Sequence, residues 1–323
     1  MKMVRVFVTG GAGFIGSHIC DRILDLGHEV VCFDNLATGF KENIEHLRNN
    51  SRFTFIEGDI RNTELLDIHL PNCTHVCHQA ALGSVPRSIE NPRRTNEFNI
   101  VGSLNVLTKA QEHSIDRLVF ASSSSVYGDN ADMPKFEDRT GNVLSPYAVT
   151  KSAFENYARV FNHIHGMETI GLRYFNVFGP RQSPEGAYAA VIPLFMKALS
   201  EGERPKIFGD GEQTRDFTYV QNAVDANILS LFGDIPDAYG KSFNIACGNT
   251  LSINEVFNKI RESIDIRLGS GNIEPIYAPP REGDIKDSLA DLTEARRCLN
   301  YFPKVDFSEG IENTVSWFIE EKK

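Results

Sequence analysis

A tyrosine and a lysine four residues apart offer acid–base chemistry in this chain. Tyr147 and Lys151 lie in the stretch Ser145–Lys151, and a run of four serines, Ser122 to Ser125, precedes them. A phenol exchanges a proton near neutral pH only if its pKa lies well below the ordinary value of about 10. A lysine at i+4 lies on the same helix face and can place a positive charge beside the phenol. The spacing therefore predicts an acid–base pair, although it also arises by chance.

The first thirty residues have the pattern of a dinucleotide-binding unit. Val4–Thr9 is a short apolar, β-branched run, glycines follow at Gly10, Gly13 and Gly16, and Phe14–Leu26 has helical periodicity. Such glycines permit a tight turn, a close approach of the backbone to a pyrophosphate, and close helix–strand packing. The amides at the start of the helix would face the phosphates. A glycine triplet placed between a strand and a helix predicts a cofactor site.

Two acidic residues extend that site. Asp34 closes the predicted strand Glu29–Asp34, where a carboxylate accepts hydrogen bonds from ribose hydroxyls and repels a 2′-phosphate, which favours NAD over NADP. Asp59 follows the predicted strand Phe53–Glu57. It either accepts a hydrogen bond from the adenine amino group or caps the next helix, and the sequence leaves both open.

The remaining elements predict an α/β fold, a Rossmann-type doubly wound parallel sheet with a smaller, discontinuous α/β substrate lobe. Further strands are expected at His75–Gln79, Arg117–Ala121, Glu168–Tyr174 and Ser242–Ala246, and helices at Asn96–His113, Pro146–His165 and Val220–Phe232. We assign residues 1–176 and 220–247 to the NAD-binding domain. Residues 177–219 and 248–323 form the second domain.

Composition excludes several classes of protein. The 323 residues carry a net charge of −10, which argues against nucleic-acid or anionic-membrane partners. Neither a signal peptide nor a membrane-spanning apolar stretch is evident, so a cytoplasmic enzyme is expected.

The cluster Cys73, His75 and Cys77 would share one strand face and invites a zinc interpretation, but no second ligand pair follows at zinc-site spacing. We predict no metal.

Together, these motifs resemble those of extended short-chain dehydrogenases/reductases. The motifs that carry the resemblance occur in order as Gly10–Gly16, Ser122–Ser125 followed by Val-Tyr127-Gly, Tyr147 with Lys151, and Arg173-Tyr-Phe-Asn176-Val. Arg215–Val220 and Arg281–Asp284 are similar to segments of UDP-hexose 4-epimerases. Ala80–Ser88 resembles the branch that acts on N-acetylated UDP-hexosamines.

The resemblance implies an activity and roles. UDP-N-acetylglucosamine and UDP-N-acetylgalactosamine would be interconverted through transient oxidation at sugar carbon 4, with NAD as the cofactor and plain UDP-hexoses also accepted. Tyr147 would take the proton of the 4-hydroxyl, Lys151 would help to hold Tyr147 as a phenolate, and Ser123 would hydrogen-bond the sugar oxygen. These three are the predicted catalytic residues. Arg215 and Arg281 match the diphosphate-binding arginines of the family, although either could form a surface salt bridge.

The predicted site residues fall into two sets. The cofactor set comprises Gly10, Gly13, Phe14, Ile15, Gly16, Asp34, Asn35, Thr38, Gly39, Asp59, Ile60, Gln79, Ala80, Ala81, Asn99, Tyr147, Lys151 and Tyr174. The substrate set comprises Ser84, Ser124, Ser125, Asn176, Val191, Lys206, Phe208, Arg215, Arg281, Asp284 and Ser288. The chain departs from hexose-only epimerases at Gly83, where those often carry a lysine that reaches the cofactor.

Single residues separate neighbouring chemistries within the resemblance. Sugar dehydratases carry an Asp-Glu pair where this chain has Ser124 and Ser125, and decarboxylases carry Glu at the second of these positions. Uronate epimerases tend to replace Asn176 with threonine, so a UDP-glucuronate 4-epimerase is disfavoured but open. Ser288 stands where a bulky tyrosine restricts other epimerases to plain hexoses, unless it is a solvated loop residue.

Two further expectations concern assembly and activity. The helices predicted at Asn96–His113 and Pro146–His165 suggest a four-helix interface of a homodimer, although one subunit could cover their apolar faces itself. Members of such folds that only sense dinucleotides typically lose the tyrosine or the lysine. Tyr147 and Lys151 are both present, so we expect an enzyme rather than a non-catalytic member.

Overall fold

The computed structural model describes residues 3–185, 189–269, 271–280 and 286–321. Its largest sheet is parallel throughout and has the strand order β11-β6-β5-β4-β1-β2-β3. The strands are β1 (Arg5–Thr9), β2 (Glu29–Asp34), β3 (Phe53–Glu57), β4 (His75–His78), β5 (Arg117–Ser123), β6 (Glu168–Tyr174) and β11 (Lys241–Ile245). This order is that of a doubly wound dinucleotide-binding sheet with one more strand at its edge. The predicted fold class is confirmed.

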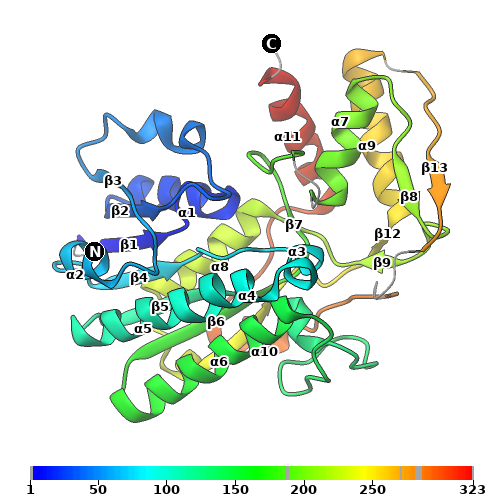
Figure 1. Ribbon diagram of the computed structural model, residues 1–323. Coiled ribbons are helices and arrows are strands. Elements are labelled where there is room, and N and C mark those ends of the chain that lie inside the picture. The colour runs from blue at the N-terminus through cyan, green and yellow to red at the C-terminus, as the bar shows by residue number, and fades with distance from the viewer. Residues whose placement is uncertain (1–2, 186–188, 270, 281–285, 322–323) are drawn as a thin grey trace.

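Helices cover both faces of this sheet (Figure 1). They are α1 (Phe14–Asp25), α2 (Thr63–His69), α3 (Val85–Glu90), α4 (Pro92–Asn96), α5 (Ser103–Glu112), α6 (Pro146–His165), α8 (Val220–Phe232) and α10 (Thr293–Leu299). Alternation along β1 places Val6 in the core shared with α1 and α8, and Phe7 in the core shared with α2, α5 and α6. The two cores hold the sheet rigid between them.

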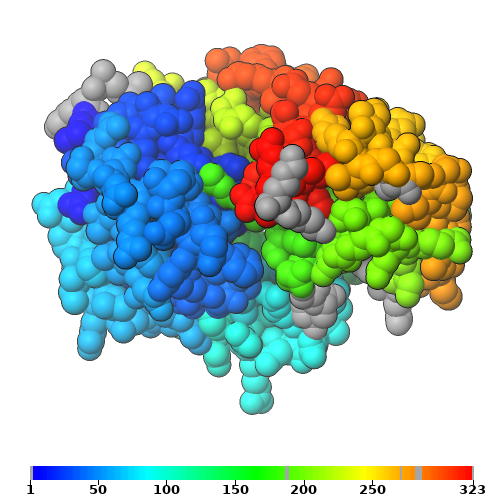
Figure 2. Space-filling model, turned by 90° about the horizontal axis from the view of Figure 1, so that it is seen from above, coloured from blue at the N-terminus to red at the C-terminus, as the bar shows by residue number. Residues whose placement is uncertain are grey.

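The second lobe has its own core, seen at the upper right of Figure 1. Its elements are β7 (Val177–Phe178), α7 (Val191–Ser200), β8 (Lys206–Phe208), β9 (Thr214–Arg215), β10 (Thr218–Tyr219), β12 (Leu251–Ser252), α9 (Ile253–Leu268), β13 (Ile276–Ala278) and α11 (Phe307–Glu320). The strands pair as β10-β7, β12-β9 and β13-β8. From above, the blue and cyan N-terminal part lies on one side, and the orange, red and green segments of this lobe lie on the other (Figure 2).

One helix belongs with the sheet rather than with the second lobe. Cys298 and Leu299 of α10 pack in the same core as Ile245 of β11. The hydroxyl of Tyr301, just after α10, donates to the carbonyl of Ala246 at 2.9 Å. Helix α10 therefore packs with the sheet, whereas the predicted boundary at residue 248 places it in the second domain.

Several element boundaries differ from the predicted ones. The helical segment predicted at Asn96–His113 begins earlier, at Pro92, and consists of α4, a π-helical turn at Glu97–Gly102, and α5, which ends at Glu112. Strand β5 continues two residues beyond the predicted Ala121, so that Ser122 and Ser123 lie on the strand itself. Shifts of one residue occur where the predictions gave Val4–Thr9, Phe14–Leu26, His75–Gln79 and Ser242–Ala246.

The cysteine and histidine cluster does not share one strand face. Strand β4 begins at His75, so Cys73 lies outside the alternation and packs in the core with Phe7, whereas Cys77 packs in the opposite core. The prediction that Cys73, His75 and Cys77 share one strand face was wrong. Within the described ranges, no group of three or more histidine, cysteine or acidic residues could hold a metal ion. No helix among them is both long and apolar enough to span a membrane.

Candidate active site

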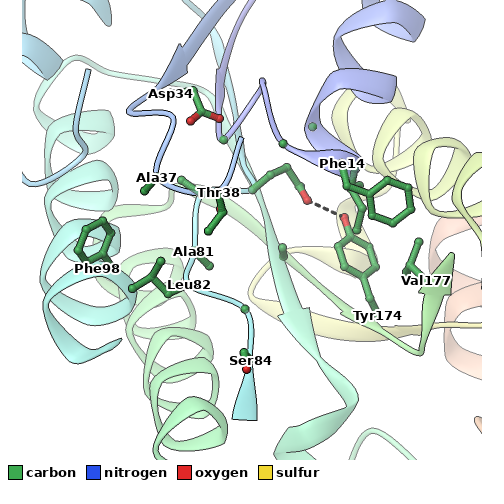
Figure 3. A pocket seen from close by; sticks show the side chains of 18 of the residues that line it. Phe14, Asp34, Ala37, Thr38, Ala81, Leu82, Ser84, Phe98, Tyr174 and Val177 are labelled. Carbon is green, nitrogen blue, oxygen red and sulfur yellow. Dashed lines mark hydrogen bonds between the residues drawn. The ribbon is translucent and has the colours of Figure 1, made fainter. Parts of the chain in front are cut away.

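A cavity of about 700 Å³ opens at the carboxyl ends of the sheet strands, beside β1 and β4, where the strand order reverses. Ligands of open α/β sheets bind at this switch point. Figure 3 shows Asp34 and Thr38 on one side of it, Leu82 and Ser84 on a second, and Tyr174 on a third. The predicted residues that line it are Gly10, Gly13, Phe14, Ile15, Gly16, Asp34, Asn35, Thr38, Ile60, Gln79, Ala80, Ala81, Ser84, Ser123, Tyr147, Lys151, Tyr174 and Asn176.

The glycine turn between β1 and α1 leaves no room for side chains. A Cβ on Gly10, whose φ is +69°, would lie 2.6 Å from the amide nitrogen of Ala80. A Cβ on Gly16 would lie 2.1 Å from the carbonyl oxygen of Gly10. Helix α1 starts at Gly13 with no side chain capping its amides. Those amides thus remain available to an anion in the cavity, as a dinucleotide pyrophosphate requires.

Asp34 provides the acceptor for a ribose. Its carboxylate accepts the backbone N–H groups of Ala12 at 3.0 Å and Leu36 at 2.8 Å, which fixes its orientation at the cavity wall. Burial raises the pKa of Asp34, and the two N–H groups lower it. Two carboxylate oxygens have further lone pairs after these bonds, so ribose hydroxyls can still donate to them. The acceptor oxygens of Asp34 and the uncapped N-terminus of α1 therefore fit NAD.

A closed set of hydrogen bonds braces another wall of the cavity. The Tyr174 hydroxyl donates to the Gln79 side chain at 3.2 Å, and the Asn227 amide of α8 donates to Tyr174 at 2.6 Å. Gln79 donates back to Asn227 at 3.1 Å. Asn227 is fully buried and was not predicted, because the local sequence of a helix gives no signal of the distant partners of one polar residue.

Helix α6 brings Tyr147 and Lys151 to the cavity together. Its start is fixed by Ser145, whose hydroxyl accepts the N–H of Ala148 at 3.1 Å, and by Pro146 in the first turn. The Lys151 Nζ lies 5.8 Å from the centre of the Tyr147 ring and donates to the carbonyl of Ala121 at 2.7 Å. Ser123 at the end of β5 hydrogen-bonds Tyr147. The predicted catalytic residues thus converge on one point.

The protein groups do not lower the pKa of the phenol. Burial raises the pKa of Tyr147, and the hydrogen bond from Ser123 acts in the opposite direction. Burial lowers the pKa of Lys151 to about 8, and the charge of Glu155 partly offsets this. The prediction that Lys151 depresses the phenol pKa thus receives no support from the protein alone, because burial dominates at both groups.

Beneath this pair lies a buried ion pair. Arg173 of β6 donates to both carboxylate oxygens of Glu155 on α6, at 2.9 and 2.8 Å. Glu155 also accepts the hydroxyl of Ser122 at 2.5 Å, and Arg173 also donates to the Tyr127 hydroxyl at 3.0 Å. Because Glu155 follows Lys151 by one helical turn, this network fixes the face of α6 that carries the acid–base pair.

Three residues of the predicted cofactor set do not line the cavity, namely Gly39, Asp59 and Asn99. Asp59 accepts two hydrogen bonds from the Arg61 side chain, at 2.9 and 2.8 Å, and one from the Arg61 backbone N–H, and these lower its pKa to about 2. It does not cap a helix either, since the cap of α2 is Asn62. The buried side chain of Asn99 instead bonds both backbone polar groups of Leu82 and thereby holds the cavity wall.

Most of the predicted substrate set also lies off the cavity. Ser124 and Ser125 begin a 3₁₀ helix behind Ser123. The residues of the second lobe that do not line the cavity are Val191, Lys206, Phe208, Arg215 and Ser288. Ser288 is only 9% exposed, so it is not a solvated loop residue. Arg281 and Asp284 lie outside the described residues.

The cavity also has walls that the sequence did not reveal. Gln182, Ser183 and Glu185 line it from the segment after β7. This segment is tied to α1, since Arg181 pairs with Asp21 at 2.8 Å. The other unpredicted lining residues are Phe33, Ala37, Phe40, Gly58, Leu82, Gly83, Arg87, Phe98, Ala121, Ser122, Val177, Ala189 and Ala190. A Cβ on Gly83 would meet nothing within 4 Å, so a longer side chain there would enter open space.

The fold and the cavity define a dinucleotide-binding enzyme of the short-chain dehydrogenase/reductase type. Residues 6–246 match the model of the NAD dependent epimerase/dehydratase family, and the chain belongs to that family. It is NAD-dependent, as the family is.

Relatives of the chain share nearly its whole length. A putative UDP-glucose 4-epimerase of Methanocaldococcus jannaschii is 39% identical over 97% of both chains. The structure of UDP-N-acetylglucosamine 4-epimerase from Methanobrevibacter ruminantium, in complex with UDP-N-acetylmuramic acid, is similar with a TM-score of 0.93 and 41% identity over 99% of this chain and 100% of that one. The UDP-glucose 4-epimerase of Thermus thermophilus, solved with NAD, has a TM-score of 0.85 and 35% identity over 98% and 99%.

Proposed function

We propose that the protein interconverts UDP-N-acetylglucosamine and UDP-N-acetylgalactosamine by transient oxidation at sugar carbon 4, and that it also accepts UDP-glucose and UDP-galactose. The convergence of Ser123, Tyr147 and Lys151 in the cavity of a NAD-dependent fold is the observation that carries this proposal. The similarity to UDP-sugar 4-epimerases along the whole chain supports it.

The residues would act as follows. Tyr147 takes the proton of the sugar 4-hydroxyl as the carbon–oxygen double bond forms, and returns it when the 4-keto group is reduced on the opposite face. Ser123 donates a hydrogen bond to the same sugar oxygen and stabilises charge on it. When bound, NAD⁺ supplies the hydride acceptor and a positive charge. Since burial raises the pKa of Tyr147, this added charge and protonated Lys151 together must favour the phenolate.

The choice among UDP-sugars rests on single side chains. Ser124 and Ser125 lack the carboxyl group that would protonate a leaving hydroxide, so elimination of water does not follow oxidation. Asn176 lines the cavity and offers a neutral amide to a neutral sugar. Ser288 is small and buried, and we propose that, although it does not line the cavity itself, it leaves room beside the bound sugar for an N-acetyl group.

A UDP-glucuronate 4-epimerase is the second candidate. Arg87, on helix α3, lines the cavity and could face a sugar carboxylate. The neutral amide of Asn176 in the same cavity favours the N-acetylated or plain hexose instead.

The function is tested by three parallel incubations. Purified protein is mixed with UDP-N-acetylglucosamine, UDP-glucose or UDP-glucuronate, and the nucleotide sugars are separated by anion-exchange chromatography. We expect the 4-epimer in the first two, with the acetylated sugar converted faster, and none in the third. Conversion of UDP-glucuronate alone would replace the proposal with the second candidate, and no conversion of any sugar would refute both.

We also propose a homodimer formed through α6. Four apolar side chains on this helix are solvent-exposed, namely Val149, Tyr157, Val160 and Ile164. Their spacing of 8, 11 and 15 residues from the first places them on one helix face. A row of exposed apolar side chains along one face of a long helix is typical of an interaction surface.

A further inference from the structure

Asp216 is a buried carboxylate that connects separate segments of the chain. It lies between β9 and β10 and is completely buried. Its Oδ1 accepts the backbone N–H of Cys247 at 2.9 Å, and its Oδ2 accepts those of Gly248 at 3.0 Å and Ala290 at 3.3 Å. Its backbone carbonyl accepts the side-chain amide of Asn176 at 3.0 Å. One residue thus joins the end of β6, the turn after β11 and the segment before α10.

These segments carry Arg215, Asn176 and Ser288, which the sequence resemblance predicts to bind the substrate of the proposed function. Arg215 directly precedes Asp216, and Ser288 lies two residues before Ala290. Asn176 adopts a left-handed backbone with φ of 34°, and its amide is held by the Asp216 carbonyl. The Arg215 side chain donates to the carbonyl of Lys286, so Arg215 is tied to the same segment as Ser288. Displacement of the Asp216 carboxylate would therefore shift Arg215 and Ser288 relative to the cavity.

Three backbone N–H groups stabilise the ionised form of the Asp216 carboxylate. Burial raises the pKa of Asp216 to about 7, and the three N–H donors act in the opposite direction. In the described part of the chain, the titratable groups that face it are the Cys247 thiol after β11 and the Tyr301 phenol after α10. The pKa of each is raised, so both stay neutral near pH 7.

We infer that Asp216 is a positioning residue that, as a carboxylate, holds Arg215, Asn176 and Ser288 in the arrangement that binds a sugar nucleotide. The inference rests on the proposed function. A protonated carboxyl carries its proton on one oxygen, and both oxygens of Asp216 already face N–H donors. At least one N–H group then loses its acceptor, and the segment that carries it moves. Substrate affinity therefore falls as pH decreases through the neutral range, whereas the acid–base pair on α6 keeps its geometry.

The test compares the dissociation constant of the wild-type holoenzyme for UDP-glucose at pH 8 and pH 6 by calorimetry. UDP-glucose is suitable because neither of its phosphates is a monoester that titrates in this range. We expect affinity to weaken about tenfold at pH 6, which corresponds to roughly 1.4 kcal/mol. An unchanged constant would overturn the inference without any variant. A protein that neither binds nor converts UDP-glucose at either pH would refute the proposed function instead.

Two variants separate positioning from a general structural role. Asp216→Asn keeps the shape but is neutral at every pH, so we expect binding that is about tenfold weaker at pH 8 and independent of pH, with kcat within about twofold of wild type. The control is Asp225→Asn on α8, which removes a carboxylate that pairs with Lys304. This variant should behave as wild type. If Asp216→Asn binds like the wild type at pH 8, keeps the pH dependence, or loses kcat and affinity together, the inference is wrong.

Discussion

At the scale of residues, Tyr147 and Lys151 lie together in the cavity, and the protein alone keeps the Tyr147 phenol neutral. Burial at the base of the cavity raises the pKa of Tyr147 and lowers that of Lys151 to about 8. Ser123 is the described neighbour whose hydrogen bond favours the phenolate. The proton transfer that we propose therefore depends on the charge that the cofactor brings, so the pair is active only in the holoenzyme.

Replacing Tyr147 with phenylalanine removes the proton acceptor and leaves the cavity walls in place. We expect the epimerisation rate to fall by about 10²- to 10⁴-fold, the usual contribution of a positioned acid–base group. The NAD content, measured by absorbance after denaturation, should be unchanged. Tyr157→Phe on the exposed face of the same helix is the matched control and should retain full activity. A Tyr147→Phe protein as active as this control would remove Tyr147 from the mechanism.

We propose that the size of the side chain at position 288 decides which sugars the site admits. A tyrosine at this buried position would fill the space that an N-acetyl group needs, so Ser288→Tyr should reduce kcat/KM for UDP-N-acetylglucosamine about a hundredfold. The value for UDP-glucose should change little. Parallel steady-state assays measure both, with Ser288→Ala as a control that should treat the two substrates as wild type does. Equal losses for both sugars would show that the tyrosine disturbs the fold rather than the pocket.

At the scale of elements, α6 and β6 are joined by the ion pair between Glu155 and Arg173. Both side chains are largely buried, at 13% and 7% exposed. A buried ion pair adds little to the free energy of unfolding compared with a well-packed apolar pair. Removal of one partner, however, leaves an uncompensated buried charge. This pair therefore constrains how α6 sits on the sheet.

We expect Arg173→Met to lower the free energy of unfolding by about 3–5 kcal/mol, because Glu155 then remains buried without its cation. Denaturant titration followed by circular dichroism measures this. Arg159→Met on the exposed side of α6 should stay within about 0.5 kcal/mol of wild type. Adding Glu155→Leu to Arg173→Met should recover most of the loss. No recovery in the double variant would mean that packing, rather than the buried charge, causes the destabilisation.

The sequence predicts strands better than it predicts which distant residues meet. The ranges Glu29–Asp34, Phe53–Glu57 and Glu168–Tyr174 were predicted to the residue, because each is a β-rich run between clear turn signals. The π-helical turn at Glu97–Gly102 was missed, since its apolar pattern is also that of an α-helix. Gln182 lines the cavity, and Asn227 bonds the lining residue Gln79, only through tertiary packing, for which the local sequence carries no signal.

At the scale of the whole molecule, two lobes with separate cores share one cavity, and the long helix α6, which packs on the sheet, also has a solvent-exposed face. The exposed stripe on α6 faces away from the cavity wall that the same helix forms with Tyr147 and Lys151. Association through this stripe would therefore bury apolar surface without closing the site. It would also stabilise the helix on which the acid–base pair is mounted.

A charge at the middle of the stripe tests this assembly. Val160→Glu should convert a dimer into a monomer, because an unpaired carboxylate would be buried at an interface that typically covers about 800 Å² on each partner. Sedimentation velocity at micromolar protein concentration distinguishes the two states. Ile266→Glu provides the matched control, since Ile266 is 82% exposed on α9 of the other lobe and should leave the assembly unchanged. A wild-type protein that sediments as a monomer, or a Val160→Glu protein that remains a dimer, would show that α6 is not the contact surface.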